Sequence, residues 1–144
     1  MDKIFIYTDG GSRGNPGPAG IGVVIKFKAQ SANVKVKDIE ISRYIGIKTN
    51  NQAEYMAVIE ALKYLNDNYC DKDIEATFFL DSQLVVEQLN QRYKVKNEGL
   101  KPLFWQIRDL MMKLGGRITF SSIPREQNKE ADRLVNKAID NHLN

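Results

Sequence analysis

The pattern of apolar and polar positions divides the chain into segments with the period of a strand and segments with the period of a helix. Residues 4–7 form an apolar, β-branched and aromatic run, which is typical of a strand buried on both faces. The run stops at Thr8 and Asp9, and a turn-rich stretch, residues 10–20, follows at once. The pattern therefore predicts a central strand with a carboxylate at its C-terminal end, the edge at which open α/β sheets bind ligands.

Two further strands are predicted after the turn. Residues 21–27 are almost uniformly apolar. Residues 37–47 show a period of two, with alternate positions occupied by Ile39, Ile41, Arg43, Ile45 and Ile47. Because the connections are short, the three strands can form an antiparallel meander.

The period becomes helical from residue 51. An apolar stripe at helix spacing has Glu54 on the same face one turn earlier, and it comprises Ala57, Val58, Ala61, Leu62 and Leu65. A helix of this length can cross the sheet and return the chain for another short apolar strand, residues 76–80. That strand ends at Asp81, which is followed by Ser82.

The remaining segments continue the alternation of helices and strands. Helices are predicted over residues 82–90 and 100–114, and the second one ends at the stop signal Gly115-Gly116. A last strand covers residues 117–123. Asn128 is in position to cap a final helix.

The order β-β-β-α-β-α-α-β-α predicts an α/β fold with a mixed five-stranded sheet. A three-stranded antiparallel meander plus two further strands would make up the sheet, flanked by helices. A chain of 144 residues is expected to form one domain, residues 1–144. The first strand would lie between an antiparallel neighbour and the Asp81 strand, so Asp9 and Asp81 would project side by side.

Composition narrows the function classes only slightly. The net charge is +3, which does not by itself indicate a nucleic-acid-binding protein. A short basic run comprises Arg92, Lys94, Lys96 and Lys101. Such a run is a solvated face unless a polyanion binds nearby. The single cysteine, Cys70, excludes an internal disulfide and a cysteine metal framework. The chain has no apolar run of membrane-spanning length and no signal-peptide pattern, so a cytoplasmic location is expected.

Four acidic residues are the main candidates for chemistry. Individually, Asp81 can cap the following helix, and Asp9 can accept hydrogen bonds from loop amides. Glu54 and Asp132 suit the first turn of their predicted helices. Together they bring several carboxylates to one sheet edge, where they repel one another unless a proton or a cation lies between them.

A carboxylate site without His or Cys suits Mg²⁺ or Mn²⁺ rather than Zn²⁺. Two such ions about 3.5–4 Å apart can activate a water and stabilise the leaving oxygen of a phosphodiester. Hydrolysis of nucleic acid is therefore the expected chemistry.

A glycine-rich nucleotide-binding loop is the competing interpretation of residues 10–14. A glycine-rich match alone is a weak signal. Pro16, Pro18 and then strand residues follow it, so no helix begins there to receive a phosphate, and no Gly-Lys-Ser/Thr motif is present. This interpretation is rejected.

Four sequence blocks resemble the signature motifs of type 1 ribonucleases H, in the order of that family and over nearly the whole chain. They are Tyr7-Thr8-Asp9-Gly10-Gly11-Ser12-Arg13-Gly14-Asn15-Pro16-Gly17, Thr49-Asn50-Asn51-Gln52-Ala53-Glu54, Asp81-Ser82-Gln83 and Asn128-Lys129-Glu130-Ala131-Asp132. The resemblance implies the ribonuclease H-like fold. It also implies an endonuclease that hydrolyses the RNA strand of RNA/DNA hybrids and leaves 5′-phosphate and 3′-hydroxyl ends.

The resemblance also assigns roles to residues. The catalytic and metal-binding carboxylates of the family, which hold two Mg²⁺ ions with Mn²⁺ as a substitute, match Asp9, Glu54, Asp81 and Asp132. Positions that contact the hybrid match Gly11, Ser12, Asn15, Asn50 and Asn51, and Glu54 also meets the RNA 2′-hydroxyl. A pocket for a DNA phosphate matches Lys26, Thr49 and Asn97.

The chain departs from the family pattern in the loop before the last helix. Family members often carry a His there, whereas this loop offers Arg125 or Glu126 as a partial substitute. The only histidine, His142, lies near the C-terminus, where a frayed surface residue is expected.

A second departure follows Asp81. Many family members insert a basic, Trp-rich helix and loop that holds the DNA strand, but this chain has only the short segment 91–97. Trp105 is expected in the core because its neighbours are apolar. No separate hybrid-binding domain is expected before the first strand.

Three alternatives remain open at this point. The shortened basic segment motivates a nuclease that also cuts double-stranded RNA. A catalytically silent nucleic-acid-binding module is the alternative outside the enzymes, although a binding module gains nothing from four repelling carboxylates. The domain could also originate from a reverse transcriptase, but a free-standing monomer is expected.

Overall fold

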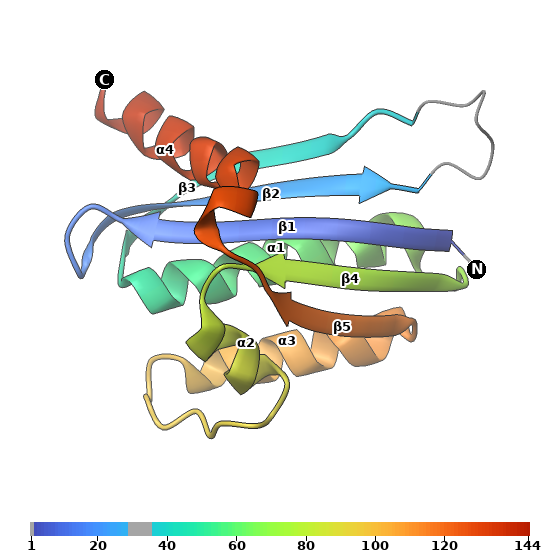
Figure 1. Cartoon of the computed structure of the whole chain (residues 1–144). Coiled ribbons are helices and arrows are strands. Elements are labelled where there is room, and N and C mark those ends of the chain that lie inside the picture. Colours follow the sequence, from blue (N-terminus) through green and yellow to red (C-terminus); the bar gives the residue numbers. More distant parts are fainter. Residues whose placement is uncertain (1, 29–35) are drawn as a thin grey trace.

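The computed structural model of the protein describes residues 2–28 and 36–144. Ten elements follow one another in the order β1 Asp2–Ser12, β2 Gly17–Phe27, β3 Ile39–Lys48, α1 Asn50–Tyr69, β4 Ile74–Leu80, α2 Gln83–Leu89, α3 Lys101–Leu114, β5 Arg117–Ser122, the short 3₁₀ helix η1 Arg125–Gln127, and α4 Lys129–Leu143. Their order along the chain is the predicted one, with η1 added (Figure 1). None of the helices in the described ranges is long and apolar enough to span a lipid bilayer.

The five strands form one mixed sheet in the order β3-β2-β1-β4-β5. β1 pairs with β2 in the antiparallel sense and with β4 in the parallel sense. The prediction that the first strand lies between an antiparallel neighbour and the Asp81 strand is therefore confirmed.

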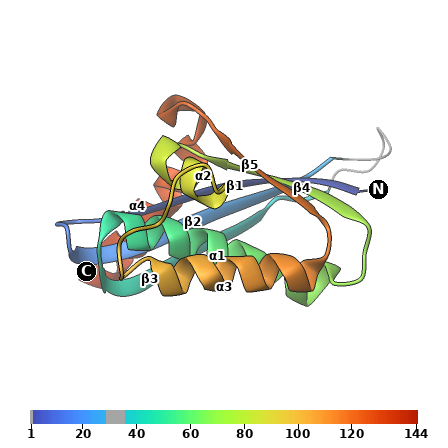
Figure 2. The same cartoon turned by 90° about the horizontal axis from the view of Figure 1, so that it is seen from below.

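Helices cover the two faces of the sheet unequally. α1 and α3 lie side by side beneath it (Figure 2), and α2 packs against β5 and β4 near their C-terminal ends (Figure 1). α4 packs on the opposite face against β1, β2 and β3 (Figure 1). Among the described residues no helix covers β4 and β5 on that face, which leaves this part of the face open.

The unequal cover explains why β1 is not buried on both faces as predicted. Ile4 and Ile6 point towards α1 and are fully buried, because they belong to the main core. Phe5 and Tyr7 point to the other face and are only partly buried. Both rings stack against Phe79 of β4, with centroid distances of 6.3 and 5.0 Å.

β1 is also longer than predicted. Its parallel pairing with β4 ends at Tyr7, but its antiparallel pairing with β2 continues to Ser12, which lies opposite Ala19. Asp9 therefore lies inside β1, at the point where β1 extends beyond its parallel neighbour. The two-strand ladder overrides the weak strand propensity of the glycines, so β2 also begins earlier than expected, at Gly17.

Local hydrogen bonds set the helix starts. Thr49 and Gln52 form a capping box, so α1 begins at Asn50 and Glu54 falls beyond its first turn. The Ser82 hydroxyl, rather than Asp81, caps α2. Asn128 occupies the N-cap position of α4 as predicted, but its side chain makes no capping hydrogen bond.

Two glycines allow helices to touch the sheet backbone on opposite faces. A methyl group on Gly10 would lie 2.2 Å from the carbonyl carbon of Ala53 in α1. A methyl group on Gly22, which pairs with Asp9, would lie 2.1 Å from the carbonyl oxygen of Ala131 in α4. Gly10 thus lets α1 approach the sheet at Ala53, next to Glu54. Gly22 lets α4 approach it at Ala131, next to Asp132.

Substitution of Gly22 tests this close approach. Gly22→Ala is expected to displace α4 and to lower the free energy of unfolding by about 1–3 kcal/mol, the usual cost of overpacking. The measurement is urea unfolding. Gly11→Ala is the matched control, because its methyl group would meet Val135 Cγ1 at an ordinary 3.6 Å. Equal stability of the Gly22 variant and the wild type would contradict the steric argument.

Candidate functional site

Four carboxylates from four elements line one cavity of about 310 Å³. Asp9 lies in β1, Glu54 in α1 and Asp132 in the first turn of α4, while Asp81 directly follows β4. The first three elements meet at Gly10 and Gly22, and the end of β4 lies beside Tyr7. The structure thus gathers all four predicted acidic residues at one place.

The electrostatics of Asp9 show how closely the negative charges are gathered. The pKa of Asp9 is raised to about 8, first by burial and then by the charges of Asp81, Glu54 and Asp132, and the Gly10 N–H, 2.9 Å from Asp9 Oδ1, offsets part of the increase. The charge of the ionised carboxylate is therefore strongly unfavourable in the protein alone.

Glu54 is similarly affected, with two compensating neighbours. The pKa of Glu54 is raised to about 7, mainly by burial and also by the charge of Asp81. A hydrogen bond with Ser82 and the positive charge of Arg125 act in the opposite direction. Arg125 lines the same cavity, so the cavity has a cation at its edge.

The four carboxylates of the cavity are the kind of ligands that a hard divalent cation prefers. All four acidic side chains offer oxygen atoms, and bound positive charge would relieve their repulsion. In the described part of the chain, however, no three His, Cys, Asp or Glu side chains are already arranged as a metal ligand set. Metal binding accordingly stays a prediction about these residues.

Asn128 connects three parts of the site. Its buried side chain donates from Nδ2 to the Thr8 carbonyl oxygen at 2.9 Å and to Asp81 Oδ2 at 3.3 Å. It therefore fixes Asp81 against β1 at the start of α4. No described residue donates a hydrogen bond to its Oδ1, which is also buried.

The β1–β2 hairpin is held against the start of α1. Ser12 donates to Asn50 Oδ1 from its backbone N–H at 2.9 Å and from its hydroxyl at 3.2 Å. Asn15 Oδ1 accepts a hydrogen bond from the Asn50 N–H at 3.0 Å. The predicted substrate residues Gly11, Ser12, Asn15, Asn50 and Asn51 thus lie on two joined segments, and Gly11, Ser12 and Asn50 line the carboxylate cavity.

Lys26 does not join Thr49 and Asn97, so the prediction of one phosphate pocket is wrong for Lys26. Thr49 and Asn97 both have Gln52 nearby: Thr49 shares a capping box with it, and the Asn97 and Gln52 side chains flank Gly99. Lys26 lies nine residues along β2 from Gly17, the partner of Lys48, a separation of about 30 Å in a strand.

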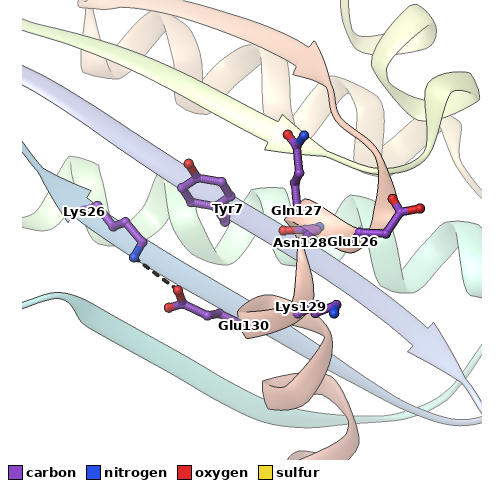
Figure 3. A pocket seen from close by; sticks show the side chains of 7 residues that line it. All are labelled: Tyr7, Lys26, Glu126, Gln127, Asn128, Lys129 and Glu130. Atoms are coloured by element: carbon purple, nitrogen blue, oxygen red, sulfur yellow. Dashed lines mark hydrogen bonds and ion pairs between the residues drawn. The ribbon is translucent and has the colours of Figure 1, made fainter.

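Lys26 belongs instead to a second cavity, of about 290 Å³ (Figure 3). Its Nζ lies 3.2 Å from Glu130 and 3.2 Å from Asp38. Tyr7 and residues 126–130 complete the lining. Of the two proposed substitutes for the missing loop histidine, Glu126 lines this second cavity, and only Arg125 lines the carboxylate cavity.

Two predictions about side-chain exposure have different outcomes. His142 is exposed as expected, although it lies within α4 and stacks on Tyr44 with the ring centroids 3.5 Å apart. Trp105 is 62% exposed, so its assignment to the core is wrong. α3 buries Ile107 and Leu114 instead.

Trp105 forms part of a surface groove of about 320 Å³. The other lining residues come from the short segment after α2 and from α3, and they are Gln91, Tyr93, Lys94, Val95, Lys101 and Phe104. Exposed aromatic rings and lysines therefore occur together where the basic run lies. The core prediction fails because Ile107 of α3 packs in the core, whereas Trp105 lies on the part of the helix that faces solvent.

Sequence reasoning missed three polar residues around the acidic side chains. The sequence indicates only a helix cap for Asn128, which bonds Asp81, and it indicates no role for Arg13 and Asn136 of the cavity wall. The helical spacing from Asp132 to Asn136 could have indicated the latter.

The raised pKa values predict how stability depends on pH without metal. The folded protein holds the protons of Asp9 and Glu54 more tightly than the unfolded chain, so their stabilisation is complete below about pH 4 and is lost as the pH rises through 7 and 8. Asp9→Asn removes one of these titrations and should flatten the decline. The measurement is urea unfolding between pH 4 and 9 in EDTA. If the free energy of unfolding declined equally steeply with pH in the variant and the wild type, the prediction would be contradicted.

Asn128→Ala is expected to lower the free energy of unfolding by about 1–3 kcal/mol, because buried acceptors lose their donor. It should also change the carboxyl NMR resonance of Asp81. Asn90→Ala is the matched control, since Asn90 Nδ2 donates to the Phe120 carbonyl oxygen at 3.1 Å in another part of the fold. If both variants left the Asp81 resonance in place, Asn128 would not be positioning that carboxylate.

Comparison with known proteins places the chain in a family. The family model described as reverse transcriptase-like matches residues 7–138. A ribonuclease H of Verminephrobacter eiseniae is 32% identical over 162 residues, which cover 99% of this chain and 94% of that protein. A bifunctional protein of Mycobacterium tuberculosis is 43% identical over 138 residues, or 96% of this chain, but the chain spans only 36% of its length.

Solved structures agree with these matches. LC11-RNase H1, isolated from compost by a metagenomic approach, is 48% identical, with full coverage of both chains and a TM-score of 0.85. Its structure in complex with an RNA/DNA hybrid aligns over 98% of this chain and 99% of that one, with 45% identity and the same TM-score. The shared fold, the family model and a relative of matching length together show that the chain belongs to the type 1 ribonuclease H family.

Proposed function

We propose that this chain is a divalent-metal-dependent endoribonuclease that hydrolyses the RNA strand of RNA/DNA hybrids to 5′-phosphate and 3′-hydroxyl ends. The observation that carries the proposal is the gathering of Asp9, Glu54, Asp81 and Asp132 around one cavity. The structure of LC11-RNase H1 with an RNA/DNA hybrid supports the substrate class.

The four carboxylates would hold two Mg²⁺ ions, with Mn²⁺ as a substitute. When bound, such ions activate a water and stabilise the leaving oxygen of the phosphodiester. The chain's own contribution is to position its oxygen donors: Asn128 orients Asp81, and the glycine contacts set Glu54 and Asp132 beside Asp9. Arg125 at the cavity edge would bind a phosphate oxygen of the RNA strand.

The β1–β2 hairpin and the start of α1 would read the hybrid by its shape. Proteins recognise such duplexes through sugar and phosphate contacts, and the 2′-hydroxyl distinguishes RNA from DNA. Because Asn15 and Asn50 use their carbonyl oxygens within the protein, their amide groups remain to donate to RNA. Thr49 and Asn97 would contact a DNA phosphate, without Lys26.

The groove at Trp105 would extend the contact with the DNA strand. Tyr93 and Trp105 are 55% and 62% exposed, and Lys94 and Lys101 lie beside them. Aromatic rings and lysines together bind nucleic-acid strands through stacking and charge. This groove would take the place of the basic insert that the chain lacks.

A silent binding module is a weaker account of the same site. Asp9 and Glu54 carry raised pKa values, so their gathering costs free energy that a module without metal would not recover. The single-domain organisation, the monomeric state and the cytoplasmic location stay predictions.

Asp81→Asn tests the proposed active site. This nearly isosteric change should lower kcat by more than about 100-fold, since even outer-shell residues of metal sites contribute about 10- to 100-fold. The measurement is cleavage of an end-labelled RNA/DNA hybrid with Mg²⁺, Mn²⁺ or EDTA. Asp67→Asn, at an exposed position of α1 outside the cavity, is the control.

Parallel substrates sharpen the result. Metal-dependent cleavage of the hybrid RNA, but not of duplex RNA or duplex DNA, is the expected outcome. Cleavage of duplex RNA as well would support the broader nuclease. Wild-type rates for Asp81→Asn would overturn the assignment of this residue, and hybrid binding without cleavage under any metal would favour the silent module.

A further inference from the structure

The tip of the β1–β2 hairpin, residues 12–17, lies where β1 ends at Ser12 and β2 begins at Gly17, the partner of Lys48 in β3. β1 loses its β4 neighbour after Tyr7, so only β2 pairs with it beyond that point. Within the hairpin, the Arg13 N–H donates to the Pro18 carbonyl oxygen at 2.8 Å. The backbone ladder of β2 and β3 holds the hairpin as far as Gly17, so side-chain contacts with the helices bear on the turn residues 13–16.

Side-chain contacts hold the hairpin tip on two sides. Towards α1, Asn50 bonds both Ser12 and Asn15, as described above. Towards α4, Arg13 Nη1 lies 2.6 Å from Asp140 Oδ1, and Arg13 Nη2 makes a longer contact of 3.4 Å with Asn136 Oδ1. The guanidinium thus spans the space between the tip and α4.

The α4 side of this contact is continuous with the carboxylate site. Asn136 Nδ2 donates to the carbonyl oxygen of Asp132 at 3.1 Å, one helical turn earlier. Arg13 and Asn136 line the same cavity as the four carboxylates. The hairpin tip is therefore tied to the helix that carries Asp132, beside the carboxylate cavity.

We propose that Arg13 is a positioning residue, which through Asp140 holds the β1–β2 hairpin against α4 at the spacing needed to contact the RNA strand. This inference rests on the proposed function, because that function assigns Gly11, Ser12 and Asn15 to the hybrid. The alternative role is a direct contact between Arg13 and an RNA phosphate, for which Asp140 would be a competitor. The observed contacts favour positioning, since the guanidinium already bonds Asp140 and Asn136 of α4.

The two roles predict opposite effects of removing Asp140. Asp140→Asn breaks the ion pair but leaves Arg13 in place. Arg13→Gln breaks the same ion pair by removing the positive charge and leaves Asp140 in place. The double variant completes the cycle. The matched controls are Arg133→Gln and Glu40→Gln, because Arg133 Nη2 and Glu40 Oε2 form a similarly exposed ion pair of 3.0 Å between α4 and β3, away from the hairpin.

A positioning role predicts that each single variant raises KM for the hybrid by about two- to fivefold at unchanged kcat, the range expected for an exposed ion pair. The double variant should be no worse than either single variant. Hydrogen exchange of the amides in residues 12–17 should become faster in all three, and the controls should change neither quantity.

Two results would overturn the proposal. If Arg13→Gln raised KM while Asp140→Asn lowered it or left it unchanged, Arg13 would act on the RNA directly. If hairpin exchange stayed at the wild-type rate in both variants, the ion pair would not hold the tip. Because exchange is measured on the free protein, it decides whether the ion pair holds the tip even if the wild type cleaves no hybrid, a result that would refute the proposed function alone.

Discussion

The direct contact of two helices with the sheet backbone is the constraint on which the site depends. Gly10 faces α1 and Gly22 faces α4, and neither position has room for a methyl group. Because Gly22 pairs with Asp9, the helices approach the same part of β1 from opposite faces. Glu54 of α1 and Asp132 of α4 can therefore approach β1 more closely than larger side chains at positions 10 and 22 would allow.

This concentration of negative charge costs free energy, and the neighbouring polar groups offset only part of it. The Gly10 N–H favours ionised Asp9, and Ser82 and Arg125 favour ionised Glu54. Burial outweighs these contributions, because both pKa values are still raised. Apolar packing holds both helices in place against this cost: α1 belongs to the main core through Tyr55 and Leu62, and α4 buries Leu134 and other apolar residues on the opposite face of the sheet.

The order of the elements could be predicted because the period of the apolar positions changes clearly between strands and helices. Sequence reasoning failed where distant parts of the chain decide the outcome. β1 extends to Ser12 because Ala19 pairs with it, and Asn128 turns away from the helix end because Asp81 accepts its hydrogen bond. Lys26 and Trp105 were misplaced because separation along a strand and the side of a helix that faces solvent depend on tertiary packing.

The four acidic residues come from positions 9, 54, 81 and 132, so the complete set spans most of the chain. Contacts between segments so far apart form only after the intervening chain has become available. A copy whose synthesis has not reached residue 128, or one cut before it, can contain Asp9, Glu54 and Asp81 but lacks Asn128 and Asp132. The order of elements therefore delays assembly of the full acidic cluster until the last helix is in place.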